Sequence, residues 1–304
     1  MSLINNANPG SQIDLVCMLY RVLNRSKSGS LAEDRLLALC RPDGLSEIED
    51  QRKRLPGELR FWSQEHHRLW HKTTEDEFHL ETRFENDSMP KPADIARLVR
   101  DVLCTSPMES VFDSQGSWEG IDQLFAMLAW VLALPECSAW PQKILNKDSL
   151  REVLSRLPAK FRLNDSELPV ALEYGHFLGF LEPRGSSGFV VDATTVVRDA
   201  VRDLLAPGQQ MSADKFLEAL AQRLPVIDGG RFRLEVEARM TEEGFRPPKE
   251  RMLSASLSHA LYRLQIAGSL KIDALSDDLN SRDMQLPSGK RVTFSRIQCL
   301  ESPE

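Results

Sequence analysis

Hydrophobic positions near the C-terminal end of the chain recur with a helical period. In "RMLSASLSHALYRLQIAGSL", Leu253, Leu257, Leu261 and Leu264 lie on one face of a helix because they are spaced by four, four and three residues. Gly268 follows, and glycine readily takes the left-handed conformation that ends many helices. The pattern predicts an amphipathic helix that stops at this glycine.

Beyond Gly268 the period changes to two. Leu270, Ile272 and Ala274 alternate with polar residues, which is typical of a half-buried strand. A polar stretch is expected to be a loop, and "LPSGKRVTFSRI" then predicts a turn and one returning strand. An earlier helix, "SADKFLEALAQRL", has Ser212 as its expected N-cap. This order predicts a winged helix, a helix-turn-helix closed by a β-hairpin wing.

The N-terminal segment repeats the order. "QIDLVCMLYRVLN" predicts a first helix, and in "SGSLAEDRLLALC" Ser30 and Glu33 predict a capping box that opens a second. "RLPGELRFWSQEH" predicts a third helix with Pro56 in its first turn. "RLWHKTTEDEFHLET" is interpreted as two short strands around "TTED".

The middle of the chain is expected to be helical. "ENDSMPKP" is typical of a linker, and "ADIARLVRDVLC" and "WEGIDQLFAMLAWVLAL" predict helices, the second apolar on most sides and therefore interior. The order helix, glycine, strand occurs again at Gly179 in "EYGHFLGFLEPRGSSGFVVD", where "PRGSSG" predicts a hairpin turn. A helix capped by Thr194 or Thr195 follows.

The predicted fold is mainly α with small β-hairpins (α+β), with tandem winged-helix units around a helical central region. We expect an N-terminal winged helix over 1–86 and a helical central region over 87–158. A second winged-helix-like unit is expected over 159–206 and a C-terminal winged helix over 207–304.

Composition narrows the class of protein. The 304 residues are 41% hydrophobic and 27% charged, as in ordinary globular chains. No apolar run approaches the roughly 20 residues that span a bilayer, and the start lacks the pattern of a signal peptide, so no membrane partner and a cytoplasmic location are expected. The five cysteines form no CxxC pair and are expected to be reduced and packed as small hydrophobes.

The net charge of −7 limits nucleic-acid binding. Phosphate neutralisation supplies most non-specific affinity for DNA, and this chain has 38 basic against 45 acidic residues. Any contact with DNA must therefore be local, assisted by a partner, or absent.

No catalytic signature is present. GxSxG, Walker A, GxGxxG and HExxH are all missing, so we expect no enzyme activity, no cofactor and no metal. A metal site is weighed against a solvated wing in "EHHRLWHKTTEDEFH", where His67 and His71 lie near carboxylates. The solvated wing is favoured because the spacing gives no compact ligand set.

Basic positions form two candidate DNA-contacting sets. The C-terminal set combines residues expected on the exposed helical face with residues beside the wing: Ser256, His259, Arg263, Lys290 and Arg291. The N-terminal set lies at the third helix: Arg52, Lys53, Arg54 and Arg60. For the N-terminal set, a solvated face balanced by Glu47, Glu49, Asp50 and Glu58 is favoured over DNA contact, because the local charge nearly cancels, whereas for the C-terminal set both interpretations stay open.

Two stretches, "EYGHFLGFLEPRGSSGFVVDATTVVRDAV" and "LSHALYRLQIAGSLKIDALSDD", together with the order of units, resemble the DpdG proteins. These belong to bacterial gene clusters that place 7-deazaguanine derivatives in DNA and restrict unmodified DNA. "DAT" stands here where "DPT" is expected. The resemblance implies a role on the restriction side of such an antiviral defence system, with no assigned active site.

We therefore expect a non-enzymatic adaptor or DNA-binding subunit whose partners are DNA and other subunits of a defence complex, of helicase or nuclease type. Three alternatives stay open. They are a winged-helix transcriptional regulator, a protein-binding winged-helix subunit of an SMC-type complex, and a metal-dependent nuclease that uses the His-rich wing.

Overall fold

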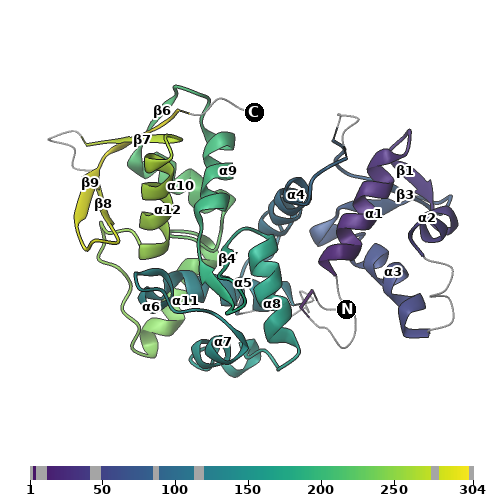
Figure 1. The fold of residues 1–304 in the computed structure, drawn as a ribbon, viewed down its shortest axis with the longest axis horizontal. Helices are drawn as coiled ribbons and strands as arrows, with labels where there is room; N and C mark the ends of the chain where they lie inside the picture. The colour runs from purple at the N-terminus through teal and green to yellow at the C-terminus, as the bar shows by residue number, and fades with distance from the viewer. Residues whose placement is uncertain are drawn as a thin grey trace. The chain divides into compact units, whose positions relative to one another are not determined.

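A computed structural model describes residues 3–4, 12–41, 49–84, 89–112, 120–274 and 281–300, apart from the side chains of 49–52 and 160 (Figure 1). The described residues form twelve α-helices and ten short strands in small antiparallel sheets. The prediction of a mainly α fold with small β-hairpins is confirmed. The chain divides into two compact units: Met1–Met108 with Gly116–Ile121, and Glu109–Gln115 with Asp122–Glu304.

The described residues of the first unit form four α-helices and one three-stranded sheet. Its helices are α1 (Ile13–Arg25), α2 (Glu33–Cys40), α3 (Glu49–Phe61) and α4 (Pro92–Cys104). Its strands are β1 (Ser30–Ala32), β2 (Trp70–Lys72) and β3 (Glu77–Leu80), in the order β1-β3-β2. The two strands expected around "TTED" are confirmed as β2 and β3.

Two details of the first unit differ from the predictions. Ser30 is not the cap of α2 but the first residue of β1, because the strand runs directly into the helix. The Glu33 N–H at the helix start donates to the Asp76 carbonyl instead, at 2.9 Å. Helix α3 begins earlier than expected, so Pro56 lies in its interior. Burial of neighbours such as Leu59 and Trp62 offsets the backbone bond that proline removes.

The first part of the second unit surrounds α5 (Ile121–Ala133), which is buried from Leu124 to its end as its apolar sequence predicts. Further elements follow: α6 (Pro135–Ser138), α7 (Lys147–Leu154), α8 (Glu167–Phe177), β4 (Leu181–Pro183) and β5 (Phe189–Val191). Strands β4 and β5 form the expected hairpin. Leu145 also pairs with Phe189 of β5, through N–H···O bonds of 2.7 and 2.8 Å.

The C-terminal part of the second unit holds four helices and five strands. The helices are α9 (Thr194–Leu204), α10 (Ala213–Arg223), α11 (Arg231–Glu242) and α12 (Ala255–Ile266). The strands are β6 (Gln210–Ser212), β7 (Leu270–Asp273), β8 (Arg282–Gln285), β9 (Arg291–Phe294) and β10 (Arg296–Cys299). They form a sheet of order β6-β10-β7 and a separate β8-β9 hairpin.

Three C-terminal features correct the sequence-based picture. Helix α11 was not predicted, and β8 forms in the stretch expected to be a loop. The single returning strand is two strands, β9 and β10, separated at the buried Ser295. The helix end at Gly268 is confirmed, since this residue has a φ of 78° and follows α12 closely.

One arrangement recurs in the two units. The order α1-β1-α2-α3-β2-β3 matches α9-β6-α10-α12-β7-β10, and in both sheets the final strand lies in the middle. The pairing is equivalent, with Ala32 opposite Glu77 and Ser212 opposite Arg296. The first N–H of the second helix also has an equivalent acceptor in both units. The Ala213 N–H of α10 donates to the Ser295 carbonyl at 2.8 Å, as the Glu33 N–H of α2 donates to the Asp76 carbonyl.

A reduced form of the arrangement lies between them, in the order α5, Leu145, α7, α8, β4, β5, with Leu145 in place of a full first strand. The Leu145–Phe189 pair joins residues from the expected central region and the expected second winged-helix-like unit. The four-part division of the chain stays a prediction.

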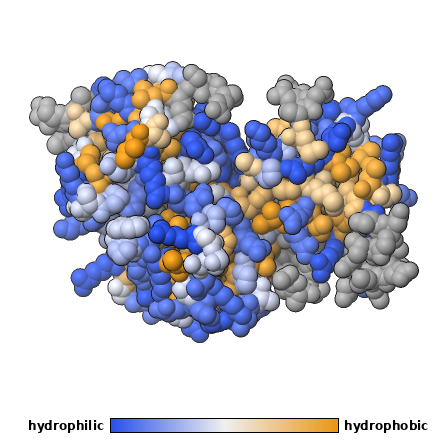
Figure 2. Space-filling model, viewed as in Figure 1, coloured by the Kyte–Doolittle hydropathy of each residue, from blue (hydrophilic) through white to orange (hydrophobic). Residues whose placement is uncertain are grey.

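All five cysteines are free and buried, as expected of packed thiols. In the part of the chain that the structure describes, no helix has both the length and the apolar character needed to cross a bilayer. On the face of the second unit drawn in Figure 2, hydrophilic side chains predominate and apolar ones form small groups.

Candidate nucleic-acid interface

The C-terminal candidate residues depend on helix α12. Its predicted apolar face is buried, with Leu257 and Leu261 at 1% and 0% exposure. The Ser254 hydroxyl caps the helix by accepting a hydrogen bond from the Leu257 N–H at 3.3 Å. The other sides of α12 contact α6, α9, β7 and β8. The exposed residues of this helix are therefore confined to its last turn: Arg263, Gln265 and Ile266.

Ser256 and His259 do not lie on an exposed face, and that prediction is wrong. They are only 5% and 7% exposed. The Ser256 hydroxyl donates to the Leu132 carbonyl at 2.9 Å, so a tertiary contact satisfies a polar group that the helical pattern placed outside. Burial, followed by the charge of Arg263, lowers the pKa of His259. This histidine is packed inside the fold.

Arg263 is the exposed member of the set on α12, and its charge is already paired. Its guanidinium forms an ion pair with Asp192. Asp192 also accepts hydrogen bonds from the Thr194 N–H at 2.9 Å and hydroxyl at 2.5 Å. The N-cap of α9 is Ala193, not Thr194 or Thr195, and the carboxylate of the preceding Asp192 bonds the first helical N–H. Arg263 ties α12 to that helix start.

Lys290 and Arg291 lie at the turn of the β8-β9 hairpin and are exposed. The Arg291 guanidinium is 3.7 Å from the Asp283 carboxylate on the facing strand. The hairpin thus offers two cations to solvent, whereas Ser256 and His259 face inward. The five C-terminal candidates do not form one surface.

The N-terminal set is arranged differently. Lys53 and Arg60, seven residues apart on α3, are both exposed and project from the same face of the helix. Arg54 is half-buried, and the side chain of Arg52 lies outside the described residues. Two of the four predicted residues therefore share an open helical face.

Glu58 does not balance that face. Its carboxylate is 1% exposed and accepts hydrogen bonds from the Trp62 indole N–H and the Gln12 N–H, each at 2.8 Å. The side chains of Glu47, Glu49 and Asp50 lie outside the described residues. The inward position of Glu58 removes one of the acidic residues expected to neutralise α3.

The hairpin of the first unit is not basic. Glu75 and Asp76 are exposed at its tip, and the Lys72 ammonium pairs with Asp76 at 2.9 Å and Glu33 at 2.6 Å. Paired carboxylates at this turn would repel phosphate. This hairpin is therefore a poorer candidate for phosphate contact than the basic face of α3.

The histidines that the sequence places near this hairpin do not form one cluster in the structure. His67 is buried, whereas the rings of His71 and His79 stack across the strands with centroids 5.5 Å apart. Their nitrogens pair with Glu81 at 2.9 Å and Glu77 at 3.2 Å. Among the described residues, no group of three or more His, Cys, Asp or Glu side chains is arranged to hold a metal ion.

Sequence reasoning missed an aromatic–cation contact on the middle hairpin. The Arg184 guanidinium lies 5.9 Å from the centre of the Trp140 ring, and Trp140 is 62% exposed. "PRGSSG" was interpreted only as a turn. No local pattern links its arginine to a tryptophan more than forty residues earlier, so only the fold shows the pair.

Comparison with known protein families identifies the family of this chain. The DpdG-like family matches residues 1–278. This chain belongs to the DpdG-like family. Membership associates the protein with the Dpd systems of DNA modification and restriction, as the resemblance implied. No curated protein and no solved structure matches the chain.

Proposed function

We propose that this DpdG-like protein is a non-enzymatic, winged-helix subunit that helps the restriction side of a Dpd system engage DNA. The observation that carries the proposal is the recurring order of helices and strands, with a central final strand in each three-stranded sheet. That order is the one a winged helix requires, and winged helices are helix-turn-helix relatives that place one helix against DNA.

The helix we assign to DNA is α3. It holds the same place in its unit as α12, but α12 is enclosed by its neighbours, whereas α3 presents Lys53 and Arg60 to solvent. A small basic face fits a chain whose net charge is −7, because such a chain needs a local contact and help from partners. Partner subunits of helicase or nuclease type would supply the remaining affinity and the chemistry.

The test is equilibrium binding of the whole protein to a fluorescent duplex across a salt series. Lys53→Ala/Arg60→Ala removes two charges from α3. Lys215→Ala/Lys249→Ala, exposed positions in the second unit, is the control with the same charge change. If each lysine or arginine replaces about one counterion, the slope of log K against log salt should shrink by about 1.8 in the α3 variant.

Two results would contradict this assignment. Equal weakening by the control variant would make the effect one of net charge. Arg263→Ala/Lys290→Ala/Arg291→Ala reports on the C-terminal hairpin in the same assay, and a loss confined to that variant would move the contact there. DNA hydrolysis by the pure protein would overturn the non-enzymatic role.

A second candidate, a protein-binding subunit such as one of an SMC-type complex, is favoured by the enclosure of α12 and the acidic hairpin tip. It predicts no DNA binding even at low salt, together with a stable complex with other subunits of the same system in co-purification. Retention of DNA binding by the protein alone argues against it.

A further inference from the structure

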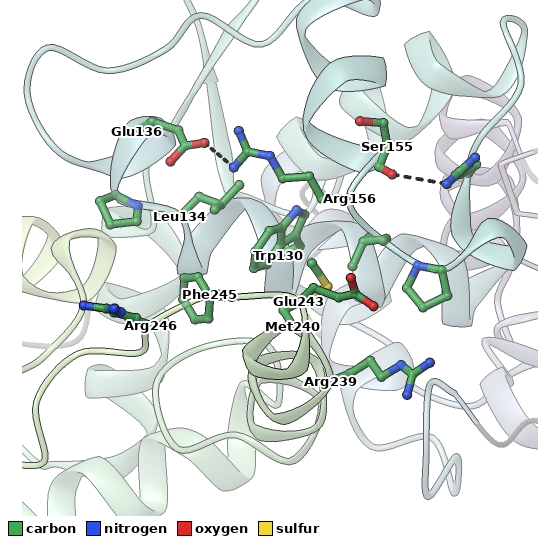
Figure 3. Close-up of a pocket in the computed structure, with 15 residues that line it drawn as sticks. Trp130, Leu134, Glu136, Ser155, Arg156, Arg239, Met240, Glu243, Phe245 and Arg246 are labelled. Atoms are coloured by element: carbon green, nitrogen blue, oxygen red, sulfur yellow. Dashed lines mark hydrogen bonds and ion pairs between the residues drawn. The ribbon is translucent and has the colours of Figure 1, made fainter.

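The second unit contains a pocket of about 720 Å³ that neither the predictions nor the family match assigns (Figure 3). It lies between the end of α5, the start of α6, the segment after α7 and the C-terminal end of α11. Its volume is within the range of small-ligand sites, which run from about 300 to 1,000 Å³.

The inner wall of the pocket is apolar and held in place. Trp130 is 1% exposed, and its indole N–H donates to the Val153 carbonyl at 3.1 Å, which fixes α7 against α5. Phe245 packs edge-on against Trp130 with ring centroids 5.1 Å apart. Gly244, with a φ of 92°, turns the chain after α11 so that Phe245 returns to this wall. Met240 and Leu157 complete it.

The rim is positively charged. Four arginines and two glutamates line the pocket, a local balance of 4 − 2 = +2 in a chain of net charge −7. The lining arginines are Arg156, Arg162, Arg239 and Arg246. In Figure 3, Arg156 and Arg239 lie on opposite sides of the Trp130 indole, so the cations border the apolar wall instead of covering it.

The arginines differ in how fully their charge is paired. Arg156 pairs with Glu136 at 2.7 Å, and Arg239 pairs with Glu242 at 2.7 Å. The Arg162 guanidinium donates to the neutral Ser155 carbonyl at 3.3 Å and, among the described residues, forms no ion pair. Within the described part of the chain, Arg246 forms no ion pair. Two guanidinium groups thus keep most of their charge for a ligand.

We propose that this pocket binds a phosphorylated nucleoside, either free or as the terminal nucleotide of a DNA strand. Guanidinium forks bond phosphate oxygens in pairs, which suits the rim. A flat base fits the wall of Trp130, Phe245 and Met240, which a sugar phosphate alone would leave uncovered. Glu243 lines the same wall as Met240, and its carboxylate accepts hydrogen bonds from N–H groups on a base edge.

Titration calorimetry of the whole protein tests the proposal. The probes are inorganic phosphate, the four deoxynucleoside 5′-monophosphates, and DNA hairpins with and without a 5′-phosphate. Arg162→Ala/Arg246→Ala should weaken nucleotide binding by about tenfold or more, since it removes the two guanidinium groups whose charge is left for a ligand. Lys147→Ala/Arg151→Ala is the matched control, because these cations lie on the exposed side of α7 and do not line the pocket.

Glu243→Ala gives a second and opposite readout. Removing this carboxylate should strengthen binding of inorganic phosphate, because repulsion is lost, and weaken binding of a mononucleotide, because the base loses its acceptor. Thermal melting of each variant confirms that it is folded, and these substitutions are exposed.

Each outcome of these experiments either supports or overturns the proposal. Mononucleotide binding that Arg162→Ala/Arg246→Ala weakens supports the free ligand, and binding only of the 5′-phosphorylated hairpin supports the DNA end. Phosphate and nucleotide binding of equal strength, equal loss in the control, or no binding of any probe overturns the proposal. A closed circular duplex has no ends and so presents no terminal nucleotide to the pocket. A variant that loses binding to this duplex therefore reports on α3 and not on the pocket.

Discussion

His67 is predicted to make the first unit sensitive to acid. Its ring is 2% exposed and packs on Phe61 and Trp62, with centroids 4.4 and 5.7 Å away. Burial lowers its pKa from 6.5 to about 4. Because the folded-state pKa lies below the unfolded one, the unfolded chain takes up the proton first as the pH falls. Stability is therefore unaffected above the unfolded pKa and decreases between pH 6.5 and 4.

The size of the effect follows from the two pKa values. Proton linkage gives a loss of about 2 kcal/mol in the free energy of unfolding between pH 7 and pH 5, and about 3 kcal/mol once the pH is below both values. A loss of 2 kcal/mol is a large part of the stability of an ordinary domain, which is roughly 5–15 kcal/mol.

The assay is urea unfolding at pH 7, 6 and 5, followed by tryptophan fluorescence, for the wild type, His67→Phe and His66→Ala. Phenylalanine keeps an aromatic ring at the site and cannot be protonated, so His67→Phe should lose most of the decrease between pH 7 and 5. His66 is the exposed neighbour and its variant should behave as wild type. If His67→Phe keeps the full pH dependence, burial of this ring is not its cause.

Three further predictions concern stability and are measured by urea unfolding at pH 7. Gly268→Ala should cost about 1–2 kcal/mol because the residue has a φ of 78°, and Gly268→Asn should cost less. Gly175→Ala should destabilise by about 1 kcal/mol, because its Cβ would lie 2.7 Å from the Leu181 Cδ1 and overpacking exceeds the gain in helix propensity. The double variant with Leu181→Ala should then lose less than the sum of the single losses. Asp192→Ala should cost about 1–2 kcal/mol through the lost cap, and Arg263→Ala less, since an exposed ion pair contributes little. Equal losses for these two would refute the role of Asp192 as a cap.

Local patterns were enough for the elements that local interactions determine. The buried helix α5 is apolar on most sides, the middle hairpin carries its Gly/Ser turn, and α12 ends at a glycine with a positive φ. Each of these features depends on residues within one or two turns of the chain. A single sequence shows such features directly.

The predictions from sequence fail where contacts between residues far apart in the chain determine the structure. Ser256 and His259 have polar side chains at polar positions of a helical wheel, but the Leu132 carbonyl and the elements around α12 enclose them. Ser30 has the spacing of a capping box and yet pairs in a strand with His79. For the same reason the pocket could not be predicted, because its arginines come from two segments about eighty residues apart.

The position of β10 has a consequence for how the protein is made. This strand separates β6 from β7, and its residue Arg296 pairs with Ser212, which was synthesised 296 − 212 = 84 residues earlier. In the first unit the equivalent pair, Ala32 and Glu77, is only 77 − 32 = 45 residues apart. On the ribosome the first sheet can therefore close while the C-terminal one still lacks its middle strand. Until β10 emerges, β6 and β7 are nascent strands whose edges are open to chaperones and to neighbouring chains.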